Sequence, residues 1–133
     1  MKVMLDTNVL AAAAAARGLC PDVLRAVLAE HELVTCPQII SELQRVLKDK
    51  FALPRALIND YVGLVQRDSI QCEPGDPLPI MLNDMDDLGI LSAAAAGGVD
   101  VLVTGDKELQ RIGMVEGLKI VTPREFWQEL TER

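Results

Sequence analysis

The chain has 133 residues, half of them hydrophobic, which suffices for one compact domain but not for two, so we expect a single domain over residues 1–133. No apolar stretch reaches the roughly 18 residues that a membrane-spanning helix requires, and no signal peptide precedes the first strand-like run, which predicts a cytoplasmic protein without membrane association. A formal net charge of −7 argues against a protein that coats nucleic acid through a broad basic surface.

Hydrophobic patterns along the chain alternate between short buried runs and stretches with helical spacing. This alternation of strands and helices predicts a three-layer α/β/α fold whose central parallel sheet has four to five strands. We expect the strands at residues 2–5, 33–36, about 69–72, 101–104 and 118–121. We expect the helices at about 11–16, 21–30, 37–50, 54–67 and 85–96, and after residues 107 and 123. The proline-rich run at 73–79 is the one clear loop.

Cysteine and histidine content excludes several kinds of site. Cys20, Cys36 and Cys72 are widely spaced and form no CxxC pair, so we expect buried free thiols in a reducing compartment. His31 is the only histidine, which excludes a cluster of histidine metal ligands. Four aromatic residues are too few to favour a stacking platform for single-stranded nucleic acid.

Two aspartates, Asp6 and Asp106, follow predicted buried strands. In open α/β sheets ligands bind beyond the carboxyl ends of the strands, which predicts that both carboxylates border one central cleft. Each of them also stands where the N-cap of a helix is expected. Taken alone, either acid is explained at least as well by capping as by metal binding.

Two further acids, Glu42 and Asp87, fall beside the apolar faces of their predicted helices. Glu42 lies about 40° beyond the apolar stripe of its helix, where a boundary salt bridge is the alternative to a functional role. Asp87 lies in the middle of the apolar face, whereas Asp86 points away from it. A capping box from Asp84 accounts for part of this placement, but an unpaired carboxylate facing a core is costly unless a cation relieves it. The four acids together therefore predict a hard divalent ion, Mg²⁺ or Mn²⁺, held by oxygen ligands.

The segments that carry these acids resemble the PIN domain family of VapC-like and PilT N-terminal-like ribonucleases, found in many bacterial toxins of toxin–antitoxin pairs. The resemblance covers nearly the whole chain, in the segments VMLDTNVL, CPQIISELQRVL, NDMDDLGILSAAAAGGVDVLVTGDKEL and LKIVTPREFW. It implies a catalytic and metal-binding quartet at Asp6, Glu42, Asp87 and Asp106, supported by Asn8 and Thr104. The chain departs from the family pattern at Ala11, where serine is frequent, and at Met85, where proline is usual.

The acids and the resemblance together predict a Mg²⁺- or Mn²⁺-dependent endoribonuclease, in which the ion activates a water for attack on an RNA phosphodiester. An RNA substrate and an antitoxin partner are implied by the resemblance, and the sequence leaves open whether the domain forms a homodimer. The basic groups available for phosphate are few, and each is also explained as a solvated surface charge: Arg17, Arg45, Lys107 and Arg111.

Two other functions stay open at this point. A receiver-like Mg²⁺-binding phospho-acceptor also gathers acids, threonine and lysine at strand ends, but its acceptor aspartate should follow the middle strand. Here the middle run leads into Glu73-Pro74-Gly75-Asp76 instead. A non-catalytic PIN-like binding module is the second alternative, and an intact acidic quartet argues against it.

Overall fold

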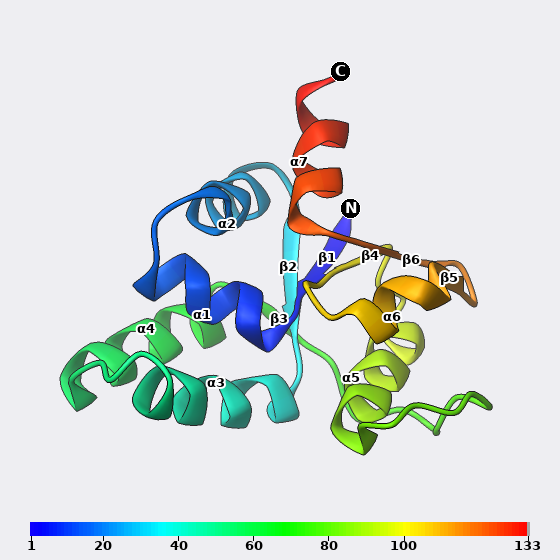
Figure 1. Ribbon diagram of the computed structural model, residues 1–133, viewed down its shortest axis with the longest axis horizontal. Helices are drawn as coiled ribbons and strands as arrows, with labels where there is room; N and C mark the ends of the chain where they lie inside the picture. Colours follow the sequence, from blue (N-terminus) through cyan, green and yellow to red (C-terminus); the bar gives the residue numbers. More distant parts are fainter. Residues whose placement is uncertain (133) are drawn as a thin grey trace.

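The computed structural model describes residues 1–132, which form a six-stranded sheet covered by helices on both faces (Figure 1). The strands are β1 (Lys2–Leu5), β2 (Glu32–Thr35), β3 (Ile70–Gln71), β4 (Val101–Val103), β5 (Met114–Val115) and β6 (Leu118–Val121). The helices are α1 (Thr7–Ala15), α2 (Leu19–Glu30), α3 (Pro37–Asp49), α4 (Arg55–Arg67), α5 (Met85–Ala96), α6 (Lys107–Ile112) and α7 (Pro123–Thr131). The predicted α/β fold with a central parallel sheet is confirmed, but the sheet has six strands in place of four to five, and one of them is antiparallel. Within residues 1–132, no helix is both long and apolar enough to cross a membrane.

Strand β5 is the element that the sequence pattern does not predict. It has two residues and pairs antiparallel with β6 across a tight turn at Glu116 and Gly117, both of which have positive φ. Such a turn is typical of a two-residue hairpin, but two residues are too few to show any hydrophobic period. The first helix also differs from its prediction, since it begins at Thr7 because the side chain of Asp6 caps it.

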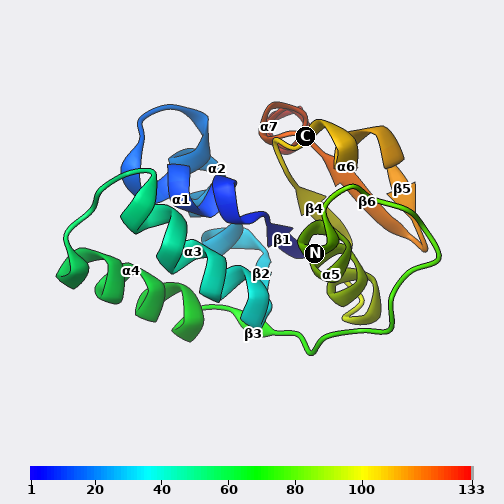
Figure 2. The ribbon, with the colours of Figure 1, turned by 60° about the horizontal axis from the view of Figure 1, so that its bottom comes forward.

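Strand order makes β1 the point at which the chain reverses its direction across the sheet. The order is β3-β2-β1-β4-β6-β5, and every neighbouring pair except β5 with β6 is parallel. Because crossovers between parallel strands are right-handed, helices that connect strands on the two sides of the reversal lie on opposite faces. Figures 1 and 2 show α1 to α4 on one side of the sheet and α5 on the other. This reversal leaves a crevice beyond the carboxyl ends of β1 and β4.

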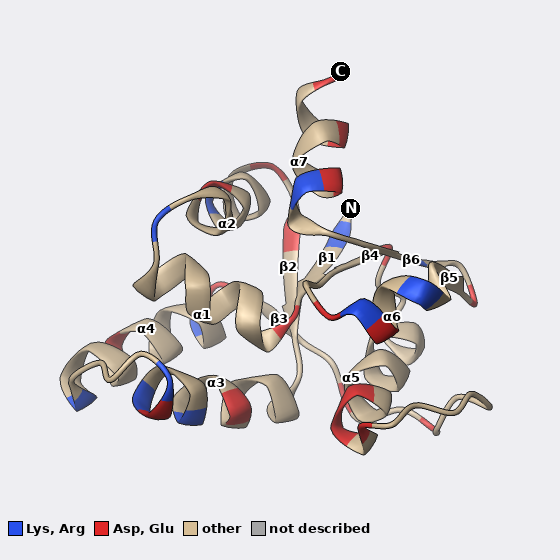
Figure 3. Cartoon of the chain, viewed as in Figure 1, with Lys and Arg blue, Asp and Glu red and all other residues tan. Residues whose placement is uncertain are grey.

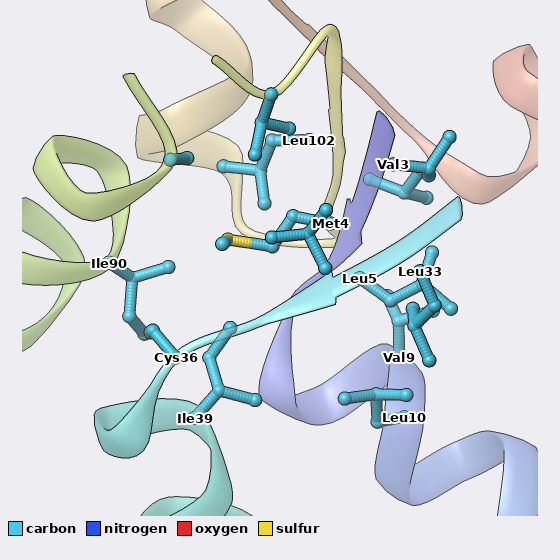
Figure 4. Close-up of a cluster of buried hydrophobic side chains, with 14 of the residues drawn as sticks. Val3, Met4, Leu5, Val9, Leu10, Leu33, Cys36, Ile39, Ile90 and Leu102 are labelled. Atoms are coloured by element: carbon cyan, nitrogen blue, oxygen red, sulfur yellow. The ribbon is translucent and has the colours of Figure 1, made fainter. Parts of the chain in front are cut away.

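Strand β1 is buried on both faces, which fixes its register. Val3, Met4 and Leu5 are fully buried. Figure 4 shows Met4 extending toward Ile90 of α5, whereas Val3 and Leu5 extend to the opposite side, near Leu33. A slip of one residue would exchange the two faces of the strand, so the packing of β1 also fixes where the next residue begins.

The loop between β3 and α5 packs closely against α5. The backbone N–H of Leu78 donates to the Oγ of Ser92 at 3.1 Å. A Cβ atom at Gly75 would lie 2.6 Å from the Cβ of Ala96 and 2.7 Å from the carbonyl oxygen of Ser92, so only glycine fits there. This contact positions the segment that leads into the first turn of α5.

We predict opposite effects for alanine at two glycines. Gly75→Ala should destabilise the protein by about 1 to 3 kcal/mol, because its Cβ overlaps backbone and side-chain atoms of α5. Gly63 lies in the interior of α4 with open space around it, so Gly63→Ala should stabilise by about 0.5 to 1 kcal/mol. Urea denaturation of both variants measures the two effects, and a neutral Gly75→Ala would show that the loop does not pack as described.

Candidate active site

A pocket of about 210 Å³ lies at the carboxyl ends of β1 and β4, between α3 and the first turn of α5. Figure 3 shows acidic bands on four segments that contribute to it: the start of α1, α3, the start of α5 and the loop after β4. The structure thus brings all four predicted acids to one pocket. The residues that line it are Asp6, Thr7, Asn8, Glu42, Arg45, Val46, Asp84, Asp86, Asp87 and Asp106.

Asp6 is both a helix cap and a member of the acidic pocket. Its Oδ1 accepts a hydrogen bond from the backbone N–H of Thr7 at 2.8 Å, and its Oδ2 accepts one from the Oγ1 of Thr104 at 2.7 Å. The side chain is only 6% exposed. Burial raises the pKa of Asp6, the two hydrogen bonds lower it, and the charges of Asp106 and Asp84 raise it further.

The Thr104 hydroxyl links the ends of β1 and β4. Besides donating to Asp6, it accepts a hydrogen bond from the backbone N–H of Asp106 at 3.0 Å, and Thr104 is fully buried. Asp106 in turn caps α6, since its Oδ1 accepts from the N–H of Leu109 at 3.0 Å. Thr104 therefore joins the carboxylate of Asp6 to the backbone of Asp106.

Glu42 is held by two residues that the sequence analysis did not single out. Its Oε2 accepts from the Oγ1 of Thr7 at 3.0 Å, and the Nε2 of Gln38 lies 3.4 Å from its Oε1. The same Nε2 donates to the backbone carbonyl of Asp86 at 3.0 Å, so Gln38 joins α3 to α5. None of the ion pairs within residues 1–132 includes Glu42, which removes the boundary salt bridge as an explanation for this acid.

Gly89 makes room for the Gln38 bridge. A Cβ at Gly89 would lie 2.5 Å from the Oε1 of Gln38. One signal of this contact is visible in the sequence, because Gln38 stands four residues before Glu42 and so shares its helix face. The second signal is Gly89, on the face of α5 that is turned toward α3. This signal cannot be recognised in the sequence before the packing of the two helices is known.

Asp87 has the most perturbed acidity in the pocket. Burial, together with the charges of Asp84, Asp106, Asp6 and Glu42, raises its pKa to about 7. The carboxyl is half-buried at the first turn of α5, as the helical projection predicts. Its protonated form is therefore well populated at neutral pH, which sets it apart from an ordinary surface aspartate.

Three further polar residues complete the pocket. Asp84 caps α5, with its Oδ1 accepting from the N–H of Asp86 at 2.8 Å, and it also lines the pocket. Asp86 is exposed, as the helical projection predicts, and it also lines the pocket. Asn8 is exposed and also lines the pocket.

Arg45 is the one basic residue among those that line the pocket. It stands one turn after Glu42 on α3 and is exposed. The other basic groups named from the sequence, Arg17, Lys107 and Arg111, do not line it. The basic side chain beside the acids is therefore contributed by α3.

The donor set fits a hard divalent cation. All the candidate ligands are carboxylates, and the raised pKa values of Asp6 and Asp87 arise partly from repulsion that a cation would offset. Within residues 1–132, no three His, Cys, Asp or Glu side chains stand close enough together to hold a metal ion as they lie. The acids share one pocket without converging on one point, in keeping with their mutual repulsion.

A family model described as "PIN domain" matches residues 2–108. Among solved structures, VapBC2 from Rickettsia felis, bound to a DNA fragment from its promoter, is 20% identical with a TM-score of 0.64, covering 92% of this chain and 98% of that one. PAE2754 from Pyrobaculum aerophilum is 19% identical with a TM-score of 0.67, and the match covers 100% of this chain and 91% of that one. VapC20 of Mycobacterium tuberculosis, a sarcin-ricin loop cleaving toxin, is 12% identical with a TM-score of 0.61, covering 86% and 97%. No curated protein sequence matches the chain.

Asp87 should make the metal-free protein less stable as the pH rises. Its pKa is about 7 in the folded state against an ordinary value of 3.8, so between these values the folded state binds more protons than the unfolded state. The free energy of unfolding that this group contributes therefore falls as pH rises toward about 7 and then stays low.

The free energies of unfolding of wild type and variants, measured in EDTA over a range of pH, test this prediction. Asp87→Asn should gain stability relative to wild type between about pH 5 and about pH 8, because the asparagine does not titrate. Asp86→Asn is the matched control and should show a much smaller change. A stability difference between Asp87→Asn and wild type that is constant over this range would contradict the burial of the carboxyl.

A double-mutant cycle tests the Gln38 bridge. In wild type, Gly89→Ala requires the end of the Gln38 side chain to shift, which disturbs its contacts with Glu42 and Asp86. In a Gln38→Ala background the atoms nearest to the new Cβ are absent, so the alanine should gain helix propensity. Urea denaturation should give a coupling free energy of at least about 0.5 kcal/mol between the two positions. Additive effects would mean that the two side chains do not compete for space.

Proposed function

Since the chain belongs to the PIN domain family, we propose that it is a Mg²⁺- or Mn²⁺-dependent endoribonuclease that hydrolyses RNA phosphodiester bonds. We further propose that it is the toxin of a toxin–antitoxin pair. This second step is supported by the likeness to VapC20, named as a toxin that cleaves the sarcin-ricin loop, and to VapBC2, solved together with promoter DNA.

The observation that carries the proposal is the crowding of carboxylates where the sheet reverses direction. Six acids from four separate segments line one small pocket, and two of them have raised pKa values. Such a group is costly for the fold unless a cation binds it. A phosphate substrate could approach so many negative charges only when that cation is present.

We assign Asp6, Asp87 and Asp106 as direct ligands of the ion, with Glu42 as a further ligand or as a base that acts through water. When bound, the ion supplies a water of lowered pKa and offsets the charge of the phosphate. The chain's own contribution is to hold the acids. Thr104 fixes the Asp6 carboxylate and the backbone of Asp106 through a single hydroxyl.

If Glu42 is the base and not a further ligand, we propose that it takes the proton of the attacking water. Thr7 and Gln38 each contact one of its oxygens, which restricts the carboxylate to one orientation at the pocket wall. In the hydrolysis, the water oxygen bonds to phosphorus and its proton passes to Glu42, while the bond from phosphorus to a ribose oxygen breaks and that oxygen takes a proton from solvent. Arg45, on the same wall, is available to neutralise a non-bridging phosphate oxygen.

The receiver-like phospho-acceptor and the non-catalytic binding module each require a feature that distinguishes them from a ribonuclease. A receiver-like protein needs its acceptor aspartate after a middle strand, whereas β3 lies at the sheet edge and is followed by Cys72 and Glu73. A non-catalytic binding module needs no cation-dependent cleavage, so a cleavage assay with a mixed RNA pool separates it from an enzyme.

We predict that Asp6→Asn and Asp106→Asn each lower metal-dependent RNA cleavage by about a hundredfold or more, since each replaces a charged ligand by a neutral side chain of similar shape. The melting temperature of Asp106→Asn in EDTA should stay the same or rise, because repulsion is relieved. Asp6→Asn gains the same relief but loses one of the two hydrogen bonds that the Asp6 carboxylate accepts. Asp76→Asn, at an exposed loop position outside the pocket, is the control and should cleave like wild type. Cleavage by Asp6→Asn at the wild-type rate would show that the metal assignment is wrong.

Melting with and without Mg²⁺ or Mn²⁺ gives a second readout that needs no substrate. The ion should raise the melting temperature of wild type by mass action and should do little for Asp6→Asn/Asp106→Asn. Equal shifts in the two proteins would place the ion outside this pocket.

A further inference from the structure

A groove of about 750 Å³ lies between α3 and α4, and its charge is opposite in sign to that of the whole chain. Three cations, Arg45, Lys48 and Arg55, line it against one acid, Asp49. None of these three cations takes part in the ion pairs formed within residues 1–132. Figure 3 shows the basic bands on the second half of α3 and at the start of α4. Among residues 1–132, the lining of the groove therefore carries more positive than negative charge.

The groove adjoins the acidic pocket, because Arg45 lines both of them. A third depression, also lined by Arg45, shares Glu42 with the acidic pocket and Ser41 with the groove. Ser41, Arg45 and Lys48 lie on one face of α3, at intervals of four and three residues. The rise of an α-helix puts Lys48 about 9 Å along the axis from Glu42.

We propose that this groove holds the backbone phosphates of an RNA strand next to the phosphate that is cleaved, with Arg45 at the junction and Lys48 and Arg55 farther along. The inference rests on the proposed ribonuclease function and gives the path of its substrate. The planar guanidinium groups of Arg45 and Arg55 match the geometry of phosphate oxygens, and Lys48 adds a point charge. Contacts of this kind position a strand without reading its sequence.

The lining of the groove favours a polyanion over a partner helix. Leu53 and Ile58 are the apolar residues that line it, whereas a bound amphipathic helix needs a continuous apolar stripe. A strand that enters the acidic pocket also meets repulsion from six carboxylates, and adjacent cations reduce that repulsion along its approach. RNA is therefore the occupant to which we commit.

Binding of a short fluorescein-labelled single-stranded RNA tests the groove. The measurements use the Asp6→Asn background, in which the strand is expected to survive, and fluorescence anisotropy over a range of salt concentrations. Lys48→Glu/Arg55→Glu should raise the Kd by about fivefold per lost phosphate contact at about 0.1 M salt. The slope of log K against log salt should fall in magnitude by about 0.7 for each contact.

Two control variants separate charge at this site from net charge. Arg25→Glu/Arg124→Glu makes the same change in net charge at exposed positions on α2 and α7, outside the groove, and should bind RNA as the background does. Lys48→Arg/Arg55→Lys keeps the local charge and should also retain binding. Both groove positions are exposed, so the charge reversals should fold, and Lys48→Gln/Arg55→Gln provides a milder version of the same test.

The possible outcomes test the groove proposal and the ribonuclease proposal separately. If Lys48→Glu/Arg55→Glu binds RNA as tightly as Arg25→Glu/Arg124→Glu does, the groove proposal is overturned while the ribonuclease proposal stands. If wild type cleaves no RNA but the groove reversals weaken binding selectively, the enzymatic proposal fails and the groove remains an RNA site. Loss of binding in Lys48→Arg/Arg55→Lys to the level of the reversals would also overturn the groove, because local charge is retained there.

Discussion

The parallel pairing of β1 with β4 is the constraint on which the rest of the site depends. It places Leu5 opposite Val103, so that the residues following the two strands meet although they are about a hundred positions apart in the chain. The Thr104 hydroxyl then bonds to Asp6 and to the backbone of Asp106. Helices on the two faces of the sheet bring Glu42 and Asp87 to the same edge. Without this pairing, four acids would remain four separate helix caps and boundary residues.

The fold tolerates the crowded acids because helix ends offset much of their charge. Asp6, Asp84 and Asp106 each cap a helix and accept a backbone N–H, and the positive end of the helix dipole favours a carboxylate at that position. Asp87 has no side-chain hydrogen bond of this kind within the described residues, and it is the acid whose pKa rises to about 7. Capping and proposed metal binding are therefore complementary functions of the same side chains, and a capping role is no argument against a catalytic one.

Much of this arrangement could be predicted from the sequence, for identifiable physical reasons. Most helices and strands follow from hydrophobic periodicity, and the half-buried position of Asp87 follows from the geometry of a single helix. The contact of Gln38 with Asp86 could not be predicted, because it depends on how α3 packs against α5. The exposure of Asp86 was predicted, but its place beside the pocket was not, since a helical projection gives direction around one axis and not the extent of a cavity. Strand β5 was missed because two residues carry no period.

Net charge is a poor guide to what this surface binds. The chain carries seven more negative than positive charges, yet α3 contributes two cations, Arg45 and Lys48, and only one acid, Asp49, to the groove. Glu42 of the same helix lines the acidic pocket. At physiological ionic strength the Debye length is about 8 Å, so exposed charges on remote faces are largely screened from a strand in the groove. A bound phosphate therefore responds to the local cations and to whatever occupies the acidic pocket. An acidic protein can bind RNA under these conditions, provided that its positive charge stands next to the acidic pocket and is not neutralised by neighbouring carboxylates.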